Sequence, residues 1–208
     1  MKITPINYGF STLPESMIFK GGSKERRRPI TFTVYLIETG GKRILVDAGC
    51  VTMPGFDMED FRGAPSALMN MGLSPDTITD LVLTHAHHDH AECVEYYKNA
   101  TVYIQKEEYE KGKKYIPEST PTVLFNDELL ICEGVKAIKI GGHSKGSCIV
   151  EIQDGSRTSV IVGDECYLSD CIEKQIPTGA SVCPERSQQF IEKYSDEKYK
   201  LLYCHDNF

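Results

Sequence analysis

A cluster of metal-binding side chains stands out in the segment His85–His90, which reads HAHHDH and holds four of the six histidines in the chain. If His85 and His87 follow the end of a strand, their side chains point to the same side and can reach one metal ion. Asp89 and His90 would then lie in the turn that opens a helix, where they can bind a second ion. Imidazole and carboxylate ligands suit zinc, iron or manganese, and the absence of cysteine here argues against a closed structural zinc site.

A histidine-rich surface turn is the alternative interpretation of this segment. The apolar run Leu81–Leu83 directly before it predicts a buried strand, which favours the metal site. Strand alternation would turn His88 away from its neighbours, so we leave His88 out of the predicted ligands.

Three later ligand types each accompany an apolar run. His143 lies in the glycine-rich turn IGGHSKG, Asp164 ends the run VIVGD, and His205 follows LLYC. Taken singly, a histidine or aspartate at a strand end is more often a capping or hydrogen-bonded residue. Together these residues would bring a complete ligand set to one sheet edge, where Asp164 could bridge two ions. Two ions about 3.5–4 Å apart would share a water molecule and lower its pKa toward neutrality, which gives hydroxide at working pH.

The elements that must position these ligands are strands interleaved with a few helices. Residues 30–50 predict two strands around a Gly-Gly turn, with Val34, Leu36, Ile44 and Val46 on the apolar side. The other predicted elements are helices at 64–72, 89–98, 106–114 (charged and solvated) and 184–195, a loop at 164–183, and strands at 80–84, 101–105, 121–125, 129–133, 135–140, 147–153, 158–163 and 199–204. This order is typical of an α/β sandwich in which helices cover two sheets packed face to face.

The overall composition excludes several classes of protein. The chain has 208 residues, 40% hydrophobic and 25% charged, so we expect a single folded domain spanning 1–208. Its formal net charge of −7 lacks the basic field of a nucleic-acid-binding protein. No apolar run reaches the roughly 18 residues of a membrane span, and the first residues lack the apolar core of a signal peptide. The eight cysteines are scattered, so we expect reduced thiols and a cytoplasmic location.

With these motifs, the chain resembles the metallo-β-lactamase superfamily over nearly its whole length. HAHHDH fits the superfamily's H-x-H-x-D-H signature, and the later ligands follow in the expected order and spacing. The resemblance implies an αβ/βα four-layer sandwich with the metals at one edge of the two sheets. It also implies that one ion is bound by His85, His87 and His143, that the other is bound by Asp89, His90 and His205, and that both are bridged by Asp164. Asp47, in a turn like the family's D-x-G, would orient a ligand histidine; the alternative is a simple turn carboxylate.

Within the superfamily, the chain is similar to the N-acyl homoserine lactone lactonases. The similarity rests on YLIETGGKRILVDAG, on SPDTITDLVLTHAHHDH and on YCHD near the end of the sequence. Tyr167 lies three residues after Asp164, where those lactonases carry a catalytic tyrosine. There the phenol would donate a hydrogen bond to the substrate carbonyl and stabilise the oxyanion, which is often worth ~3 kcal/mol. The alternative for Tyr167 is a core or loop aromatic.

Three features depart from the lactonase pattern. Glu92-Cys93 stands where a glycine pair commonly follows the D-H of the motif, and Ser147 replaces a second histidine after the Gly-His turn. The segment between Cys50 and the helix at 64–72, which helps to form the substrate entrance, is short.

Two smaller features are also open to two interpretations. The basic run Lys24–Arg28 predicts a solvated loop, with contact to an anionic substrate group as the alternative. Cys166 and Cys204 lie beside two predicted ligands; we expect small buried fillers, with oxidation sensitivity as the alternative.

The sequence therefore predicts a dinuclear metal-dependent hydrolase that cleaves a lactone or similar ester by a metal-bridging hydroxide. Its cofactors would be two divalent ions, zinc or alternatively iron or manganese, with Tyr167 polarising the carbonyl and Asp89 moving a proton to the leaving oxygen. A thioesterase similar to glyoxalase II and a non-catalytic metal-bearing protein that binds a small molecule are the alternatives. We expect a small-molecule substrate, no nucleic acid and no membrane; the oligomeric state stays open.

Overall fold

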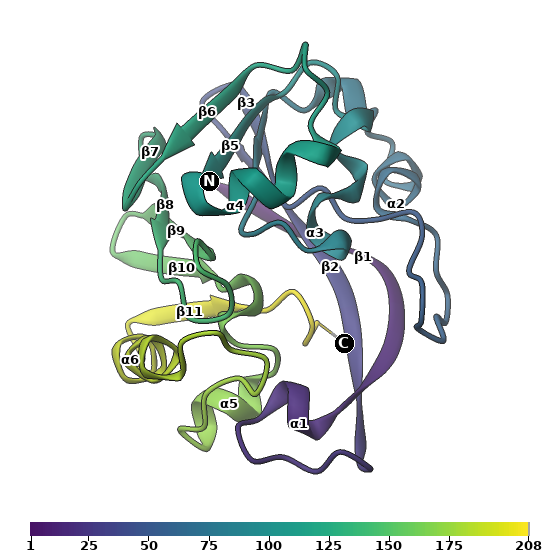
Figure 1. Ribbon diagram of the computed structural model, residues 1–208. Helices are drawn as coiled ribbons and strands as arrows, with labels where there is room; N and C mark the ends of the chain where they lie inside the picture. The colour runs from purple at the N-terminus through teal and green to yellow at the C-terminus, as the bar shows by residue number, and fades with distance from the viewer. Residues whose placement is uncertain (208) are drawn as a thin grey trace.

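Two mixed β-sheets form the centre of the computed structural model, which describes residues 1–207 (Figure 1). Six strands form the first sheet, in the order β1 (Lys2–Pro14), β2 (Arg27–Thr39), β3 (Lys42–Val46), β4 (Asp80–Val82), β5 (Thr101–Gln105) and β6 (Thr122–Phe125). Five strands form the second sheet, in the order β11 (Tyr199–Leu202), β10 (Arg157–Ile161), β9 (Cys148–Asp154), β8 (Val135–Lys139) and β7 (Glu128–Cys132). The strands β3 to β6 pair in parallel, as do β10 and β11.

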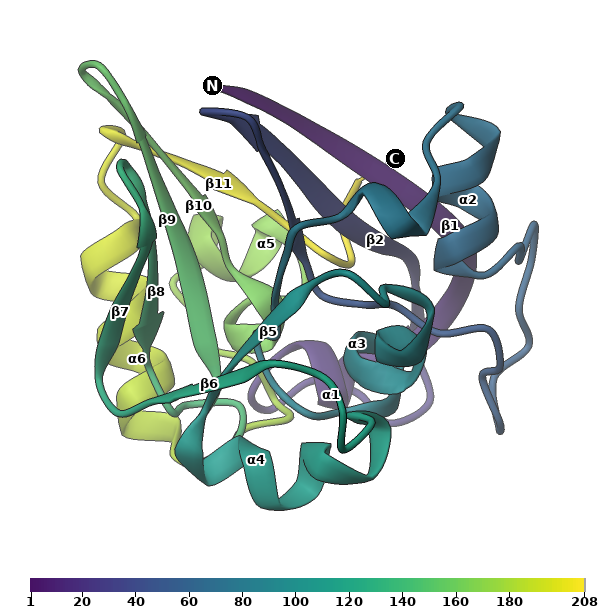
Figure 2. The ribbon, with the colours of Figure 1, turned by 90° about the horizontal axis from the view of Figure 1, so that it is seen from above.

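Short helices cover the outer faces of the two sheets. They are α1 (Glu15–Ile18), α2 (Ala64–Asn70), α3 (His88–Ala91), α4 (Lys106–Gly112), α5 (Ser169–Glu173) and α6 (Pro184–Tyr194). α2 packs against β1, and α4 packs against β5 and β6. α5 and α6 lie together on the side of the second sheet (Figure 2). The predicted α/β sandwich is therefore confirmed, whereas the single domain over 1–208 stays a prediction.

The first sheet is apolar on both faces, which corrects one detail of the sequence analysis. The hairpin at 30–50 forms as β2 and β3, but the expectation of one apolar side is wrong. Val34 and Leu36 pack in the cluster that includes the helices, whereas Ile44 and Val46 pack between the sheets. The register explains this, because Leu36 pairs with Leu45 and not with Ile44 or Val46. A sheet that is covered on both faces has no solvent face, so the pattern of apolar residues along its strands does not show which residues share a face.

Several boundaries differ from the prediction. The helix expected at 89–98 ends at Ala91 and continues as a 3₁₀ turn over Glu92–Tyr96, and the loop expected at 164–183 contains α5. The strand expected at 80–84 ends at Val82, so the histidine segment begins in a loop. The long strand β1 was not predicted at all; it pairs with β2 along its length, with an irregularity between Asn7 and Gly9.

The remaining sequence expectations concern exposure and redox state. All eight cysteines are free thiols, and Cys166 and Cys204 are fully buried, as expected for fillers. In the basic run, Arg26 pairs with Glu15 and Arg28 with Asp170. None of the helices in residues 1–207 has the length and apolar character that a bilayer span requires.

Candidate metal centre

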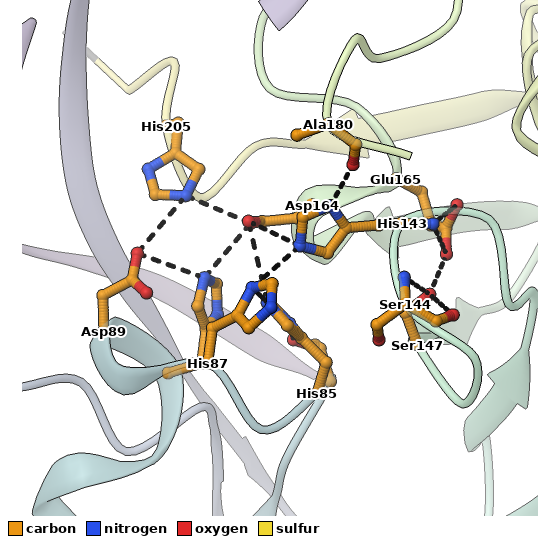
Figure 3. Close-up of polar contacts among 12 residues, drawn as sticks. His85, His87, Asp89, His143, Ser144, Ser147, Asp164, Glu165, Ala180 and His205 are labelled. Carbon is orange, nitrogen blue, oxygen red and sulfur yellow. Dashed lines mark hydrogen bonds and ion pairs between the residues drawn. The ribbon is translucent and has the colours of Figure 1, made fainter. Parts of the chain in front are cut away.

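Four predicted ligands converge on one point at the edge where the two sheets meet (Figure 3). They come from the loop after β4, the loop between β8 and β9, and the 3₁₀ turn Gly163–Glu165 after β10, and they are His85, His87, His143 and Asp164. The Nδ1 atom of His87 lies 2.9 Å from the Nε2 atoms of both His85 and His143. Asp164 Oδ2 lies 3.6 Å from His85 Nε2 and 3.3 Å from His143 Nε2. We call these four residues the first ligand set.

A second group of ligand atoms converges next to the first. Asp89 and His90 come from α3, and His205 follows β11. The Nε2 atoms of His90 and His205 both lie 3.1 Å from Asp164 Oδ1, and the same atoms lie 3.6 and 3.9 Å from Asp89 Oδ2. These three residues with Asp164 form the second ligand set. Asp164 thus offers one carboxylate oxygen to each set, which is the arrangement that a bridging ligand needs.

The spacing of both sets fits a divalent ion. Nitrogen and oxygen ligands bind zinc at about 2.0–2.1 Å, so neighbouring ligands of a tetrahedral site lie about 3.4 Å apart. The atom pairs named above lie 2.9–3.6 Å apart in the first set and 3.1–3.9 Å apart in the second set, which brackets that value, and all four ligand atoms of the first set lie within 4.8 Å of one another. His90 Nε2 is also a buried nitrogen without a hydrogen-bond partner among the described residues. Such an atom is costly unless it binds something, and an ion held by the second set would satisfy it.

Hydrogen bonds on the far side of the ring orient three of the histidines. His143 Nδ1 lies 2.6 Å from the carbonyl oxygen of Ala180, and His205 Nδ1 lies 2.8 Å from that of Thr31. A carbonyl oxygen can only accept, so Nδ1 donates in both rings and Nε2 keeps a lone pair directed at the ligand sets. His90 Nδ1 lies 2.8 Å from Asp47 Oδ2, which acts in the same way.

Charge and burial shift the histidine pKa values of the two ligand sets in opposite directions. Burial lowers the pKa of His85 well below its usual range and also lowers that of His143. Burial is the largest single effect on His90 and His205 and acts to lower their pKa values. The negative charges of Asp164 and Asp89, joined at His90 by Asp47, together outweigh burial, so both pKa values are raised. Burial acts to raise the pKa of Asp164 itself, but the surrounding histidines hold it well below the usual range. His90 and His205 of the second ligand set therefore take up protons at a higher pH than His85 and His143 of the first.

We expect acid to weaken binding at the second ligand set first. Because the pKa values of His90 and His205 are raised, a falling pH protonates them before His85 and His143, and a proton competes with a metal ion. Lowering the pH from about 8 to about 6 should reduce the affinity for one ion by roughly 10-fold or more, with a smaller effect on the other. Chelator competition at the two pH values measures both affinities, and an equal loss at both sites would contradict this order.

Asp47 links two of the loops that carry ligands. This carboxylate is buried and has a left-handed backbone with φ of 65°. Its Oδ1 accepts a hydrogen bond of 2.7 Å from the backbone N–H of Thr84, and its Oδ2 accepts one of 2.9 Å from the Thr84 hydroxyl. The Thr84 hydroxyl lies 3.1 Å from His85 Nδ1, while Asp47 Oδ2 faces His90. Of the two interpretations of Asp47, the geometry favours orientation of ligands.

Asp47→Ala should therefore weaken metal binding without removing any ligand. Loss of such a supporting carboxylate typically costs 10–100-fold in metal affinity or activity. We expect a loss of this size in isothermal titration of the metal-free variant. An affinity equal to that of the unmodified protein would leave Asp47 as a turn carboxylate only.

A cavity of about 290 Å³ opens next to both ligand sets. Its polar side includes His87, Asp89, Asp164 and Tyr167. Its other side is formed by apolar residues from β1, α1, β2 and the loop after β3, namely Leu13, Met17, Ile30, Phe32, Met53 and Phe56. No lysine or arginine is among the residues that line it. His88, which we left out of the ligands, also lines the cavity, and its ring nitrogens face Thr52 and Tyr115.

Tyr167 lies at the boundary between the ligands and the apolar wall. Its ring stacks on His205, with centroids 5.0 Å apart, and meets His143 edge-on at 5.9 Å. Burial raises the pKa of its phenol well above the usual range, and the charges of Asp164 and Asp89 raise it further. The phenol therefore stays neutral and can donate a hydrogen bond into the cavity.

Two buried carboxylates beside the first ligand set were not predicted. Glu108 is 1% exposed although its helix was expected to be solvated, and Glu165 is 0% exposed. Burial raises the pKa of Glu165 to about 7. The only sequence signal was indirect: Ser147, a departure from the lactonase pattern, donates its hydroxyl hydrogen to Glu165.

Residues 32–186 match the family model of the metallo-beta-lactamase superfamily. The chain belongs to the metallo-beta-lactamase superfamily. Its fold and the position of the two ligand sets at the sheet edge agree with this membership.

Two curated proteins and one solved structure are similar to the chain at modest identity. It is 24% identical over 177 residues to the N-acyl homoserine lactonase AiiB of Agrobacterium fabrum, which covers 66% of this chain and 64% of that protein. It is 24% identical over 200 residues to the N-acyl homoserine lactonase of Bacillus thuringiensis, covering 83% and 80%. A solved N-acyl homoserine lactone hydrolase with N-hexanoyl-L-homoserine bound aligns with a TM-score of 0.84 and 22% identity, covering 99% of this chain and 93% of that one.

Proposed function

We propose that the protein is a dinuclear metal-dependent hydrolase that opens a lactone or a closely similar ester. The observation that carries the proposal is the sharing of Asp164 between two convergent ligand sets at the base of an apolar cavity. The ions would be held by His85, His87 and His143, by Asp89, His90 and His205, and by Asp164 between them. The lactonases among its relatives support the reaction class.

Two bound divalent ions, zinc in our proposal, would supply Lewis acidity and activate water near neutral pH. The chain's own residues do the rest. Tyr167 donates a hydrogen bond to the ester carbonyl oxygen, where negative charge develops as the tetrahedral intermediate forms. Asp89 lines the cavity, accepts the proton that the attacking water releases and passes it to the leaving oxygen. Asp47 and the carbonyl groups of Thr31 and Ala180 keep the ligand rings in place.

The cavity favours an uncharged substrate with an apolar acyl group. Its apolar wall gains free energy from burying hydrocarbon, at roughly 25 cal/mol per Å². An anionic substrate group would find no lysine or arginine among the lining residues. A small neutral lactone with an acyl chain meets both conditions, whereas a glutathione thioester brings carboxylates without partners. The eight free thiols also support a cytoplasmic location, which we include in the proposal.

A hydrolysis screen of the zinc-loaded protein tests this function. The panel contains acylated lactones, simple esters, neutral and anionic thioesters, and β-lactams, with proton release followed by a pH indicator. We expect ring opening of lactones that stops on chelation and returns with zinc. Turnover of thioesters without lactones would replace the proposal by a thioesterase. A protein loaded with two ions but inert toward the whole panel would indicate a non-catalytic binding protein.

A further inference from the structure

The loop that presents His143 is held by carboxylates that no ligand role explains. This loop joins β8 to β9 and reads IGGHSKGS over residues 140–147. It is rich in glycine and therefore has little conformational preference of its own. Yet His143 must place Nε2 within about 3 Å of the other ligands of the first ligand set, as it does at 2.9 Å from His87. Something outside the loop must fix it.

Glu165 fixes the start of this loop (Figure 3). It accepts hydrogen bonds of 3.1 Å from the backbone N–H of Gly142 and of 3.2–3.3 Å from that of His143. The hydroxyl of Ser147 donates to it as well. A Cβ at Gly142 would collide with Glu165, so the backbone approaches the carboxylate as closely as only glycine allows. Because Glu165 directly follows Asp164, it ties two members of the first ligand set together.

Glu108 fixes the end of the same loop and also the other ligand loop. Its Oε1 accepts hydrogen bonds of 2.7 Å from the Ser144 hydroxyl and of 2.9 Å from the backbone N–H of Gly146. Its Oε2 accepts one of 3.1 Å from the backbone N–H of Ala86, which stands between His85 and His87. One carboxylate of α4 thus connects the loops that carry all three histidines of the first ligand set.

The charge of these two groups has no local counterpart. Neither Glu108 nor Glu165 forms an ion pair with a lysine, arginine or histidine in residues 1–207, and both are fully buried. A buried carboxylate is costly unless hydrogen bonds and an opposite charge compensate it. The hydrogen bonds are present here. The positive charge would come from a divalent ion in the first ligand set, because the ligands of that set are three neutral imidazoles and one shared carboxylate.

We infer that Glu108 and Glu165 form a carboxylate clamp that positions the first ligand set and raises the affinity of its metal ion. The inference rests on the metal centre of the proposed function, but not on its substrate. Both residues act through the ligand loops and touch neither substrate nor ion, so they are positioning residues. The second ligand set, whose own residues come from α3 and the segment after β11, has no hydrogen bond to either carboxylate in the described part of the chain.

Metal titration of the full-length, metal-free protein tests the clamp, with zinc as the probe and chelator competition as the readout. Glu108→Gln and Glu165→Gln keep the size of each side chain but place an amide N–H₂ against backbone donors. We expect each variant to lower the affinity for one of the two ions by about 10–100-fold and the affinity for the other by less than about 3-fold. Glu151→Gln is the matched control, because Glu151 accepts a hydrogen bond from the Tyr194 hydroxyl and contacts no ligand loop. It should leave both affinities unchanged.

A double-mutant cycle identifies which ion responds. In a His87→Ala background, which lacks a ligand of the first set only, Glu108→Gln should have no further effect on the remaining ion. Ser144→Ala and Ser147→Ala each remove one donor to the clamp and provide milder variants if a Glu→Gln chain does not fold. We expect each serine variant to lower the affinity for the same ion by a factor of a few.

Two results would overturn the clamp. One is that all four clamp variants keep the zinc affinities of the unmodified protein. The other is an equal loss of affinity at both sites, which would mark a general loss of stability. These results differ from a failure of the proposed function. An unmodified protein that binds two ions but opens no lactone would remove the substrate assignment and leave the clamp standing. An unmodified protein that binds fewer than two ions would overturn both.

Discussion

Asp164→Ala is expected to strip the protein of bound metal and to reduce hydrolysis by roughly 10³-fold or more, because several kcal/mol of charge stabilisation depends on the two ions. Each carboxylate oxygen of Asp164 faces a different ligand set, at 3.1 Å from His90 and His205 and at 3.3 Å from His143. Among the predicted ligands in residues 1–207, only Asp164 has an oxygen within 4 Å of histidine nitrogens from both sets. Losing this one residue should therefore affect both ions, whereas losing any histidine should affect mainly one.

Elemental analysis of the purified variant, beside the unmodified protein, measures this effect. Asp164→Asn serves as the companion variant, because asparagine keeps the shape of the side chain and removes its charge. Thermal unfolding in the presence of chelator separates loss of metal from loss of fold, since the metal-free forms should unfold at similar temperatures. Two ions per chain in Asp164→Ala would contradict the bridging role.

Tyr167→Phe is expected to lower kcat by about 10²-fold, the usual effect of removing one oxyanion-stabilising donor, while leaving metal content intact. Phenylalanine preserves the stacking on His205 and the edge contact with His143, so the ligand sets should not move. KM should change little, because the hydrogen bond strengthens as charge develops on the carbonyl oxygen and contributes less to the bound substrate.

The matched control for this variant is Tyr35→Phe. Tyr35 is also buried, but its hydroxyl donates to the carbonyl oxygen of Tyr203 at 2.6 Å, outside the cavity. Its removal should cost stability and leave kcat unchanged. If Tyr167→Phe retains full turnover with two ions bound, Tyr167 is an aromatic wall of the cavity and takes no part in the reaction.

The seven residues of the two ligand sets stay predicted metal ligands, but their convergence could be predicted because their chemistry is rare and their spacing is fixed. Six histidines in the whole chain leave little room for coincidence when four fall within His85–His90. The later ligands, such as His205, each follow an apolar strand, and strands of a sandwich end at shared edges. Even so, His85 and His87 converge from a loop and not from a strand, so one step of the reasoning that placed them is wrong.

The strand β1 and the faces of β2 and β3 could not be predicted in the same way. β1 contains Pro5, Gly9, two threonines and one serine, which blur its alternation. The segment forms a strand because it pairs with β2. This pairing joins residues far apart in the sequence, so the local residue pattern does not reveal it. In β3, Ile44 and Leu45 pack on opposite faces of the sheet, and both are buried. Because both faces carry apolar residues, the sequence shows no alternation that assigns each residue to a face.

The supporting carboxylates were missed because a single glutamate carries no sequence signal of burial. Glu108 belongs to KEEYEKGKK, where its charged neighbours are exposed. Tertiary contacts with the His143 loop and with Ala86 bury it. Glu92 is similar: it stands in place of a glycine in the lactonase pattern, and its carboxylate accepts hydrogen bonds of 2.8 and 3.0 Å from the N–H groups of Val51 and Thr52. It thereby anchors the segment that leads to the apolar wall of the cavity.

The dinuclear centre can be observed in a crystal structure of the zinc-loaded protein, with anomalous diffraction recorded on both sides of the zinc edge. We expect two anomalous peaks about 3.5–4 Å apart, one within the first ligand set and one within the second, with one oxygen of Asp164 on each. A single peak, or two peaks with Asp164 turned away from either of them, would contradict this arrangement.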